Sequence, residues 1–373
     1  MIRTATIATA IAIASLLGGC GESGNGSPQG PWTTGPARVV LTSEPAESFA
    51  PLVVLHARET RFPIGAAKFI ESSTFKWLLG KCLSYENVAV GDIARVKAPG
   101  NPPPVDPSRM GDRNPYRHAA VGRACRGKGR GPQFAANRPT RPFDPSDRPA
   151  GLPLDQGFYL ELLTAAGPGE RTLSKVGEHR FVGPVPAYVE QTATRVEGAP
   201  ALRLTYWLLY GQNRPPKGAP GRQHEGDWER VGVLLRREGP RRYMPISLRL
   251  YSNERTVDVP WRSVQRVPER SPGAASHPVA FAALGTHTLY PRPGTHDARA
   301  KAIFEIDTGK ERTADCAACP RWRTWTRIED ASDQPWYGFG GAWGATYGDA
   351  DAQPFTIAPL GPSRYARERI SVE

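Results

Sequence analysis

Glycine and proline are the most constraining feature of this sequence: 39 glycines and 38 prolines make up about a fifth of its 373 residues. Proline removes a backbone donor and glycine is unfavourable inside a helix, so long helices are disfavoured over most of the chain. Turn residues instead separate short runs of apolar and β-branched residues at the spacing expected of a β-sandwich. The sequence therefore predicts an all-β protein, a β-sandwich with long loops and one or two short helices.

The pattern also predicts where individual elements lie. Apolar and β-branched runs predict strands at 158–163, 185–190, 201–210, 228–236, 243–251, 279–284 and 302–306. One helical stretch is expected at 66–79.

The first nineteen residues have the features of an export signal, with Arg3 followed by a short apolar stretch at 7–17. This stretch is too short to span a bilayer. It ends in Leu17-Gly18-Gly19-Cys20, which resembles the lipobox of bacterial lipoproteins. An ordinary secretory peptide with an incidental cysteine is the alternative, but Cys20 stands directly after Leu-Gly-Gly, where the lipobox requires it. We therefore expect residues 1–19 to be a lipoprotein signal peptide and Cys20 to be lipidated.

The rest of the chain divides into a tether and one domain. Residues 20–38 are mostly glycine, serine, proline and polar residues, which predicts a flexible tether. Residues 39–373 are expected to form a single β-sandwich domain with a basic, Pro/Gly-rich insertion at about 97–151. No second apolar run approaches the roughly 20 residues of a membrane helix, so the acyl group is the expected membrane attachment. The predicted location is the cell envelope, lipid-anchored and extracytoplasmic.

The formal net charge of +12 is unevenly distributed. Between Arg109 and Arg141 there are nine Arg or Lys residues and one acid, Asp112. This segment has few large apolar residues, so it is expected to be a mobile loop rather than a docking helix. In the envelope, attraction to anionic lipid or cell-wall polymer fits it better than binding to nucleic acid, which is not expected.

Four cysteines remain besides Cys20, and export would place them in a compartment that permits disulfides. They allow three pairings, of which we favour Cys82 with Cys125 and Cys316 with Cys319. The second pair forms a C-x-x-C that is alternatively redox-active or half of a zinc site. A zinc site would need two further ligands and a redox motif a βαβ context, so a structural disulfide is preferred.

The densest polar cluster runs from Gln223 into an apolar strand. Side chains two apart on a strand share a face, so Asp227 and Glu229 point the same way, with Cα atoms about 6.6 Å apart, and Val231 continues that face. Two carboxylates there repel each other unless a cation or a proton lies between them. His224, placed by the turn at Gly226, would supply a third ligand. An exposed turn whose acids are solvated or paired with neighbouring arginines is the alternative.

Carboxylate ligands suit calcium, magnesium or manganese. Because one ligand is an imidazole, zinc is an alternative ion. A hypothetical divalent cation is therefore the expected cofactor.

Several motifs resemble the family of vacuolar protein sorting-associated protein 62. They are Phe49-Ala50-Pro51-Leu52 with Glu59 and Pro63, Tyr206-Trp207 to Tyr210 with Asn213, His224 to Val231, Leu250-Tyr251-Ser252, His277-Pro278-Val279 to Gly285-Thr286-His287, and Phe339 to Gly344. The resemblance covers most of residues 49–362. The basic insertion and the C-x-x-C depart from the family pattern.

A narrower resemblance is to the necrosis-inducing cytolysin-like proteins, β-sandwich toxins with a His, Asp-Trp-Glu segment at the same spacing. In those proteins the matching positions hold a divalent cation that engages sphingolipid head groups. The resemblance implies metal ligation by His224, Asp227 and Glu229. Both groups also have a small residue before a histidine that matches His287, which implies a hydrogen-bonding or second-shell role, and Asn213 is a weaker candidate of that kind. A core histidine is the alternative for His287.

The aromatic residues Trp336, Tyr337, Phe339 and Trp343 alternate with glycines, which favours packing into the core over a sugar-stacking platform.

Three functions remain open. The first is a membrane-anchored lipoprotein that uses a divalent cation to bind a polar head group or glycan. The second is a metal-dependent or carboxylate-pair hydrolase of envelope glycan or lipid, although no G-x-S-x-G motif is present. The third is a structural envelope protein.

Overall fold

The computed structural model describes residues 32–77, 84–85, 140–141, 158–162, 184–339, 343–344 and 361–362, with short gaps at 222, 252–255, 269–270, 272 and 302–305. The predicted export signal and lipidation site, Cys82, Cys125 and nearly all of the basic insertion lie outside these residues. Within the described ranges, no helix is long and apolar enough to cross a membrane.

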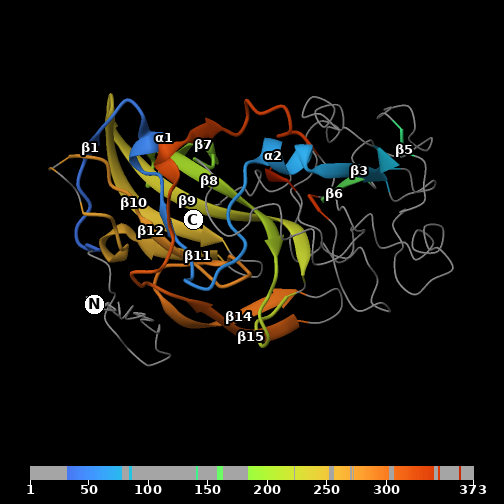
Figure 1. Ribbon diagram of the computed structural model, residues 1–373. Coiled ribbons are helices and arrows are strands. Elements are labelled where there is room, and N and C mark those ends of the chain that lie inside the picture. The colour runs from blue at the N-terminus through green and yellow to red at the C-terminus, as the bar shows by residue number, and fades with distance from the viewer. Residues whose placement is uncertain are drawn as a thin grey trace, which may run out of the picture.

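Two sheets stacked face to face form the body of the molecule (Figure 1). The larger sheet comprises β1 (Val40–Leu41), β7 (Ala187–Val196), β8 (Ala199–Asn213), β9 (His224–Gly239), β10 (Arg242–Tyr251), β11 (Thr256–Pro260) and β17 (Ile328–Asp330). Its strand order is β1-β10-β9-β8-β7-β17, and β11 pairs with β10. The smaller sheet comprises β2 (Leu52–Val54), β12 (Val279–Ala282), β13 (Leu289–Tyr290) and β16 (Arg321–Arg323), in the order β13-β12-β2-β16. The predicted all-β sandwich is confirmed.

Smaller elements flank the sandwich. A hairpin of β14 (Gly294–Lys301) and β15 (Ile306–Thr313) lies below it in the view of Figure 1. A small sheet holds β3 (Ser73–Trp77), β4 (Ser84–Tyr85), β5 (Thr140–Arg141) and β6 (Phe158–Leu162). The helices described are α1 (Pro45–Ser48) and α2 (Ala66–Glu71), with single 3-10 turns η4 (Trp261–Ser263) and η5 (Thr324–Thr326).

Most predicted strands are present. The runs at 158–163, 185–190, 201–210, 228–236, 243–251 and 279–284 correspond to β6, β7, β8, β9, β10 and β12. The run at 302–306 falls mainly on residues outside the described part, and β15 begins at its last residue.

The helix expected at 66–79 is too long. Helix α2 ends at Glu71, and residues 73–77 form β3, which pairs with β6. The Ser73 hydroxyl donates to the Phe69 carbonyl at 2.6 Å, so it satisfies one of the last carbonyls of the helix. The following residues, Thr-Phe-Lys-Trp, favour extended structure, and the partner strand fixes that choice.

The main core lies between the two sheets. Alternate residues of β8, including Tyr206, Leu208 and Tyr210, point into it, and Val53 meets them from the smaller sheet. The intervening residues Trp207 and Leu209 point outward but are also buried. Helix α2 and the aromatic residues Trp336, Phe339 and Trp343 cover them and form with them a second cluster on the outer face of the larger sheet. The 206–210 segment of β8 therefore has buried aromatic or aliphatic side chains on both faces.

The domain begins earlier than the sequence indicated. Thr33 exchanges two backbone hydrogen bonds with Arg266, at 3.0 and 2.9 Å, and the amide of Gly35 donates to the Arg262 carbonyl. Trp32 also packs against a third apolar cluster on the smaller sheet. Residues 32–38, assigned to the tether by composition, thus lie against the sandwich, because backbone pairing does not require apolar side chains.

Candidate functional site

The candidate site begins where β9 enters the sandwich. Asp227 and Glu229 lie opposite Tyr210 and Leu208 in the β8–β9 ladder, and they share their face with Val231 in the core. The two acids are only 5% and 7% exposed, so they are not part of a solvated turn. Burial of two neighbouring carboxyl groups between sheets requires compensation from other groups.

Gly226 makes the local geometry possible. Its φ is +56°, a conformation that L side chains rarely adopt. A Cβ atom there would lie 1.6 Å from the carbonyl oxygen of Trp343, in the aromatic segment that packs against this part of β9. Any side chain would force the two backbones apart and move His224 and Asp227 relative to each other.

His287 reaches Asp227 from the connection between β12 and β13. Its Nδ1 lies 2.8 Å from Asp227 Oδ2, while its Nε2 lies 3.2 Å from the Arg61 carbonyl and 3.7 Å from Glu59 Oε2. The ring is fully buried and stacks on Tyr210 at 3.9 Å between centroids. The structure thus places His287 in direct contact with a predicted metal ligand.

The His287 ring is a buried cation. Burial lowers its pKa, but Glu59 and Asp227 outweigh this and raise the pKa to about 10. Burial also acts to raise the pKa of Glu59, yet His287 and hydrogen bonds from the Gly285 and Arg61 amides hold it at about 2. At neutral pH the imidazolium therefore lies between the carboxyl groups of Glu59 and Asp227, and both ring nitrogens are donors.

Two further acids bring the cluster to four carboxyl groups, which one imidazolium could not balance if all were ionised. Burial, followed by repulsion from Asp227, raises the pKa of Glu229 well above its ordinary value. Burial also raises the pKa of Glu311, on β15, although Tyr290 Oη donates to it at 2.6 Å. The cluster contains four carboxyl groups and a single charged histidine, so it favours a proton or a cation near Glu229 and Glu311.

His224 presents a lone pair to the cluster. Its Nδ1 lies 3.2 Å from the Glu225 carbonyl oxygen, which can only accept, so Nδ1 carries the hydrogen. Burial lowers the pKa of His224 and favours the neutral ring, which leaves Nε2 as an acceptor. That Nε2 is 3.9 Å from Asp227 Oδ1, so two electron-pair donors face each other beyond hydrogen-bond distance.

Asn213 lies beside this pair. It is opposite His224 in the β8–β9 ladder and 5% exposed, and its Oδ1 has no hydrogen-bond partner among the described residues. The hydroxyl of Tyr210 is likewise buried without a partner in the described ranges. Buried polar atoms without partners are uncommon and often mark a place where a water or an ion binds.

The donor set fits a cation only in part as the side chains stand. Among the described residues, no group of three His, Cys, Asp or Glu side chains is gathered closely enough to hold a metal ion. His224 and Asp227 supply two facing donor atoms, and Asn213 lies next to them.

Two site residues were not predicted from the sequence. Glu59 belongs to one of the motifs that carry the family resemblance but was not assigned a role, although its Oε2 accepts the Gly285 amide at 2.7 Å. Glu311 lies in a Lys-Glu-Arg segment that is typical of an exposed hairpin, so no local pattern could identify it.

Cys316 and Cys319 form a disulfide, as predicted. The predicted pair of Cys82 and Cys125 lies outside the described residues. Trp336, Phe339 and Trp343 are at most 1% exposed and belong to one cluster with Trp228, which confirms the core prediction for these three. Tyr337 is only partly buried and packs against that cluster.

Comparisons with protein families, curated proteins and solved structures found no match. The resemblance to the vacuolar protein sorting-associated protein 62 family therefore stays a prediction.

Proposed function

We propose that this chain is a membrane-anchored extracytoplasmic lipoprotein whose sandwich uses a divalent cation to bind a polar head group or glycan. His224, Asp227 and Glu229 would hold the ion. One observation carries the proposal: the Nε2 lone pair of His224 faces Asp227 Oδ1 at 3.9 Å inside an acid-rich, buried cluster. Metal–ligand bonds of about 2.0 to 2.6 Å would let one ion reach both atoms.

The surrounding residues support this role. His287 donates to Asp227 Oδ2, which orients the carboxylate so that Oδ1 faces His224. The Glu225 carbonyl accepts a hydrogen bond from Nδ1 of His224, which fixes the tautomer of that ring and leaves Nε2 free to bind an ion. Outer contacts of this kind commonly orient the ligands of metal sites. Carboxylates with one imidazole suit calcium, magnesium or manganese.

A bound ion would contribute charge to the recognition of a phosphate or another oxygen-rich group. Its own positive charge would offset the excess of carboxylates, and an open coordination position would accept an oxygen of the ligand. The acyl anchor on Cys20 would keep this site close to a membrane surface, and the basic insertion would add attraction to anionic lipid or cell-wall polymer.

A carboxylate-pair hydrolase is less well supported. One Asp227 oxygen is engaged by the buried His287 ring, so this carboxyl group is not free to act on a substrate as an acid or a nucleophile. A glycosidase of this type needs both carboxyl groups beside the scissile bond.

Thermal unfolding in the presence of divalent ions tests the proposal. Millimolar calcium, magnesium or manganese should raise the melting temperature of the wild-type protein, and chelator should reverse the rise, because an ion that binds only the folded state stabilises it. Asp227→Asn and Glu229→Gln should each abolish the response, and His224→Ala should weaken it. Glu238→Gln removes an acid from the same strand outside the site and should respond like wild type.

If no ion shifts the wild-type transition and the two carboxylate variants are as stable as wild type, the site holds no metal. A structural envelope protein or the hydrolase would then take precedence.

A further inference from the structure

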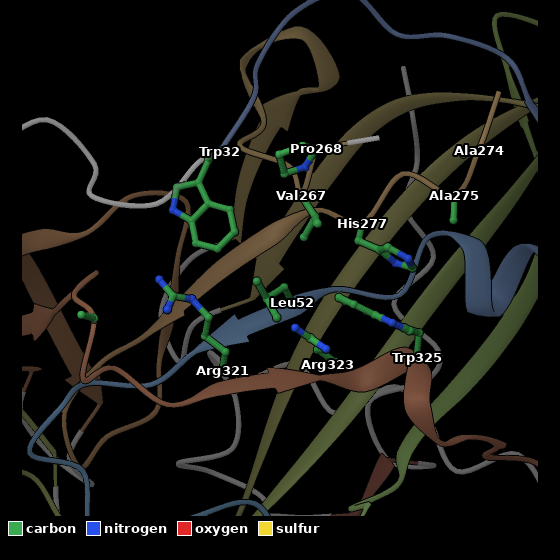
Figure 2. A pocket seen from close by; sticks show the side chains of 11 residues that line it. Trp32, Leu52, Val267, Pro268, Ala274, Ala275, His277, Arg321, Arg323 and Trp325 are labelled. Atoms are coloured by element: carbon green, nitrogen blue, oxygen red, sulfur yellow. The ribbon is translucent and has the colours of Figure 1, made fainter. Parts of the chain in front are cut away.

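A pocket of about 760 Å³ lies on the outer face of the smaller sheet, away from the acid cluster (Figure 2). Val53 and Trp322 point from this sheet into the main core, so their neighbours on β2 and β16 point outward. The outward residues of β2 are apolar: Leu52 and Val54 belong to a separate buried cluster, and the partly buried Trp32, Val267 and Trp325 pack against it and line the pocket. The exposed face of a sandwich sheet is ordinarily polar, so an apolar hollow here indicates a binding site.

One wall of the pocket is held by a buried acid. The side chain of Asp315 is 1% exposed. It accepts a hydrogen bond from Trp32 Nε1 at 2.6 Å and another from the Arg321 guanidinium at 3.0 Å. The Arg321 guanidinium also lies 5.3 Å from the centre of the Trp32 ring. Asp315 immediately precedes the Cys316–Cys319 disulfide, which limits the motion of this loop. The wall is therefore formed before any ligand binds.

The opposite wall is aromatic. His277 stacks on Trp325 at 3.8 Å between ring centroids, and its Nδ1 donates to the Ala50 carbonyl at 2.9 Å. Burial lowers the pKa of His277, so the ring is neutral and its Nε2 is an acceptor. Figure 2 shows these two rings on one side, Trp32 and Arg321 on the other, and Leu52 between them.

The pocket contains one uncompensated charge. Asp315 balances Arg321, whereas the guanidinium of Arg323 has no hydrogen-bond or ion-pair partner among the residues that the structure describes. Arg323 is exposed and lies opposite Leu52 in the β16–β2 ladder, so its charge stands at the edge of the apolar floor. A guanidinium beside an apolar surface matches a ligand with both an apolar part and an anionic group.

We propose that this pocket binds a small amphiphilic anion, with its apolar body against Leu52, Trp32 and Trp325 and its carboxylate or phosphate on Arg323. Neither a purely polar anion nor a neutral apolar molecule would use both parts of the pocket. The site is independent of the proposed cation site, because Asp227 and Glu229 lie between the sheets and the pocket lies outside them.

Titration calorimetry of the full chain with a matched set of probes tests this assignment. Octanoate and octyl phosphate should both bind saturably. Comparison of their affinities shows whether the pocket prefers a carboxylate or a phosphate. Octanol should bind at least about tenfold more weakly, since it lacks the charge. Acetate and inorganic phosphate should show no binding, since they lack the apolar body.

Two variants locate the binding. Arg323→Gln should reduce octanoate affinity about tenfold and leave octanol unchanged. Arg237→Gln makes the same change in net charge on the larger sheet and should have no effect. Ala275→Trp should fill the pocket and weaken the binding of octanoate, octyl phosphate and octanol without removing a polar contact. Equal binding of octanoate and octanol, equal effects of the two arginine variants, or wild-type binding by Ala275→Trp would each overturn the proposal.

Discussion

At the scale of single residues, His287 controls the electrostatics of the buried cluster. It lies between Asp227 and Glu59, and its φ of +55° is unusual for a residue other than glycine. Positions of this kind are strained and persist only where surrounding contacts fix them. Here the stacked Tyr210 ring and the two carboxylates provide those contacts. Removal of the imidazole would leave buried acids without their counter-charge.

The dependence of stability on pH should report this pairing. The pKa of His287 is raised to about 10 from an ordinary 6.5, so its stabilising contribution is complete below pH 6.5 and is lost as pH rises to 10. The pKa of Glu59 is lowered to about 2 from 4.5, so its contribution is complete above pH 4.5 and is lost as pH falls to 2. Urea unfolding in the presence of chelator should therefore show the highest free energy of unfolding between pH 4.5 and 6.5, where both contributions are complete.

A His287→Gln variant separates this effect from other titrations. It should be less stable than wild type at neutral pH by roughly 3 to 5 kcal/mol, and its stability should no longer decline between pH 6.5 and 10 through this group. An unchanged alkaline slope in the variant would show that another group is responsible.

At the scale of elements, the entry of β9 depends on close contact between two backbones. Gly226→Ala should destabilise the protein by more than the roughly 1 kcal/mol cost of a positive φ, because the new Cβ collides with the Trp343 carbonyl. Gly198→Ala is the matched control, since Gly198 has a φ of +77° but a Cβ added there would meet no atom within 4 Å. Equal losses in chemical denaturation would mean that the backbone contact contributes nothing.

The disulfide belongs to this scale as well. A loop closed by Cys316 and Cys319 is short, so Cys316→Ser should cost about 2 kcal/mol or less in the chain-entropy account. If the predicted pair of Cys82 and Cys125 also forms, intact mass should change by two bonds on reduction. Free thiols at Cys316 and Cys319 in protein taken from the envelope would contradict the structural role and reopen a redox or metal role.

Strand periodicity was enough to predict part of the site. The alternation of β9 placed Asp227, Glu229 and Val231 on one face, as the structure shows. It gave no information on Glu59 or Glu311, because these acids join the cluster through contacts distant in sequence and their local segments are typical of exposed loops. The end of α2 was also missed, since pairing of β3 with β6 overrides a local helical pattern.

At the scale of the whole molecule, the proposed cation site and the proposed amphiphile pocket lie on different sides of the smaller sheet. The first lies between the sheets, and the second is on the outer face beside Trp32. Trp32 is also the first described residue, twelve positions after Cys20 in the sequence. A chain lipidated at Cys20 would therefore carry its acyl group only a short tether away from the pocket, about 40 Å at full extension.

Lipidation is the prediction that determines where these sites act. The Leu17-Gly18-Gly19-Cys20 junction predicts that the chain is cleaved before Cys20 and carries an acyl group on that residue. Wild-type protein should fractionate with membranes and incorporate a labelled fatty acid, whereas Cys20→Ala should accumulate as an uncleaved precursor without label. Cys319→Ala serves as a control for loss of a cysteine elsewhere and should still be labelled. If wild type and Cys20→Ala incorporate the same amount of label, Cys20 is not the site of acylation. The proposed cation site and the pocket would then not be held at a membrane by an acyl group on Cys20.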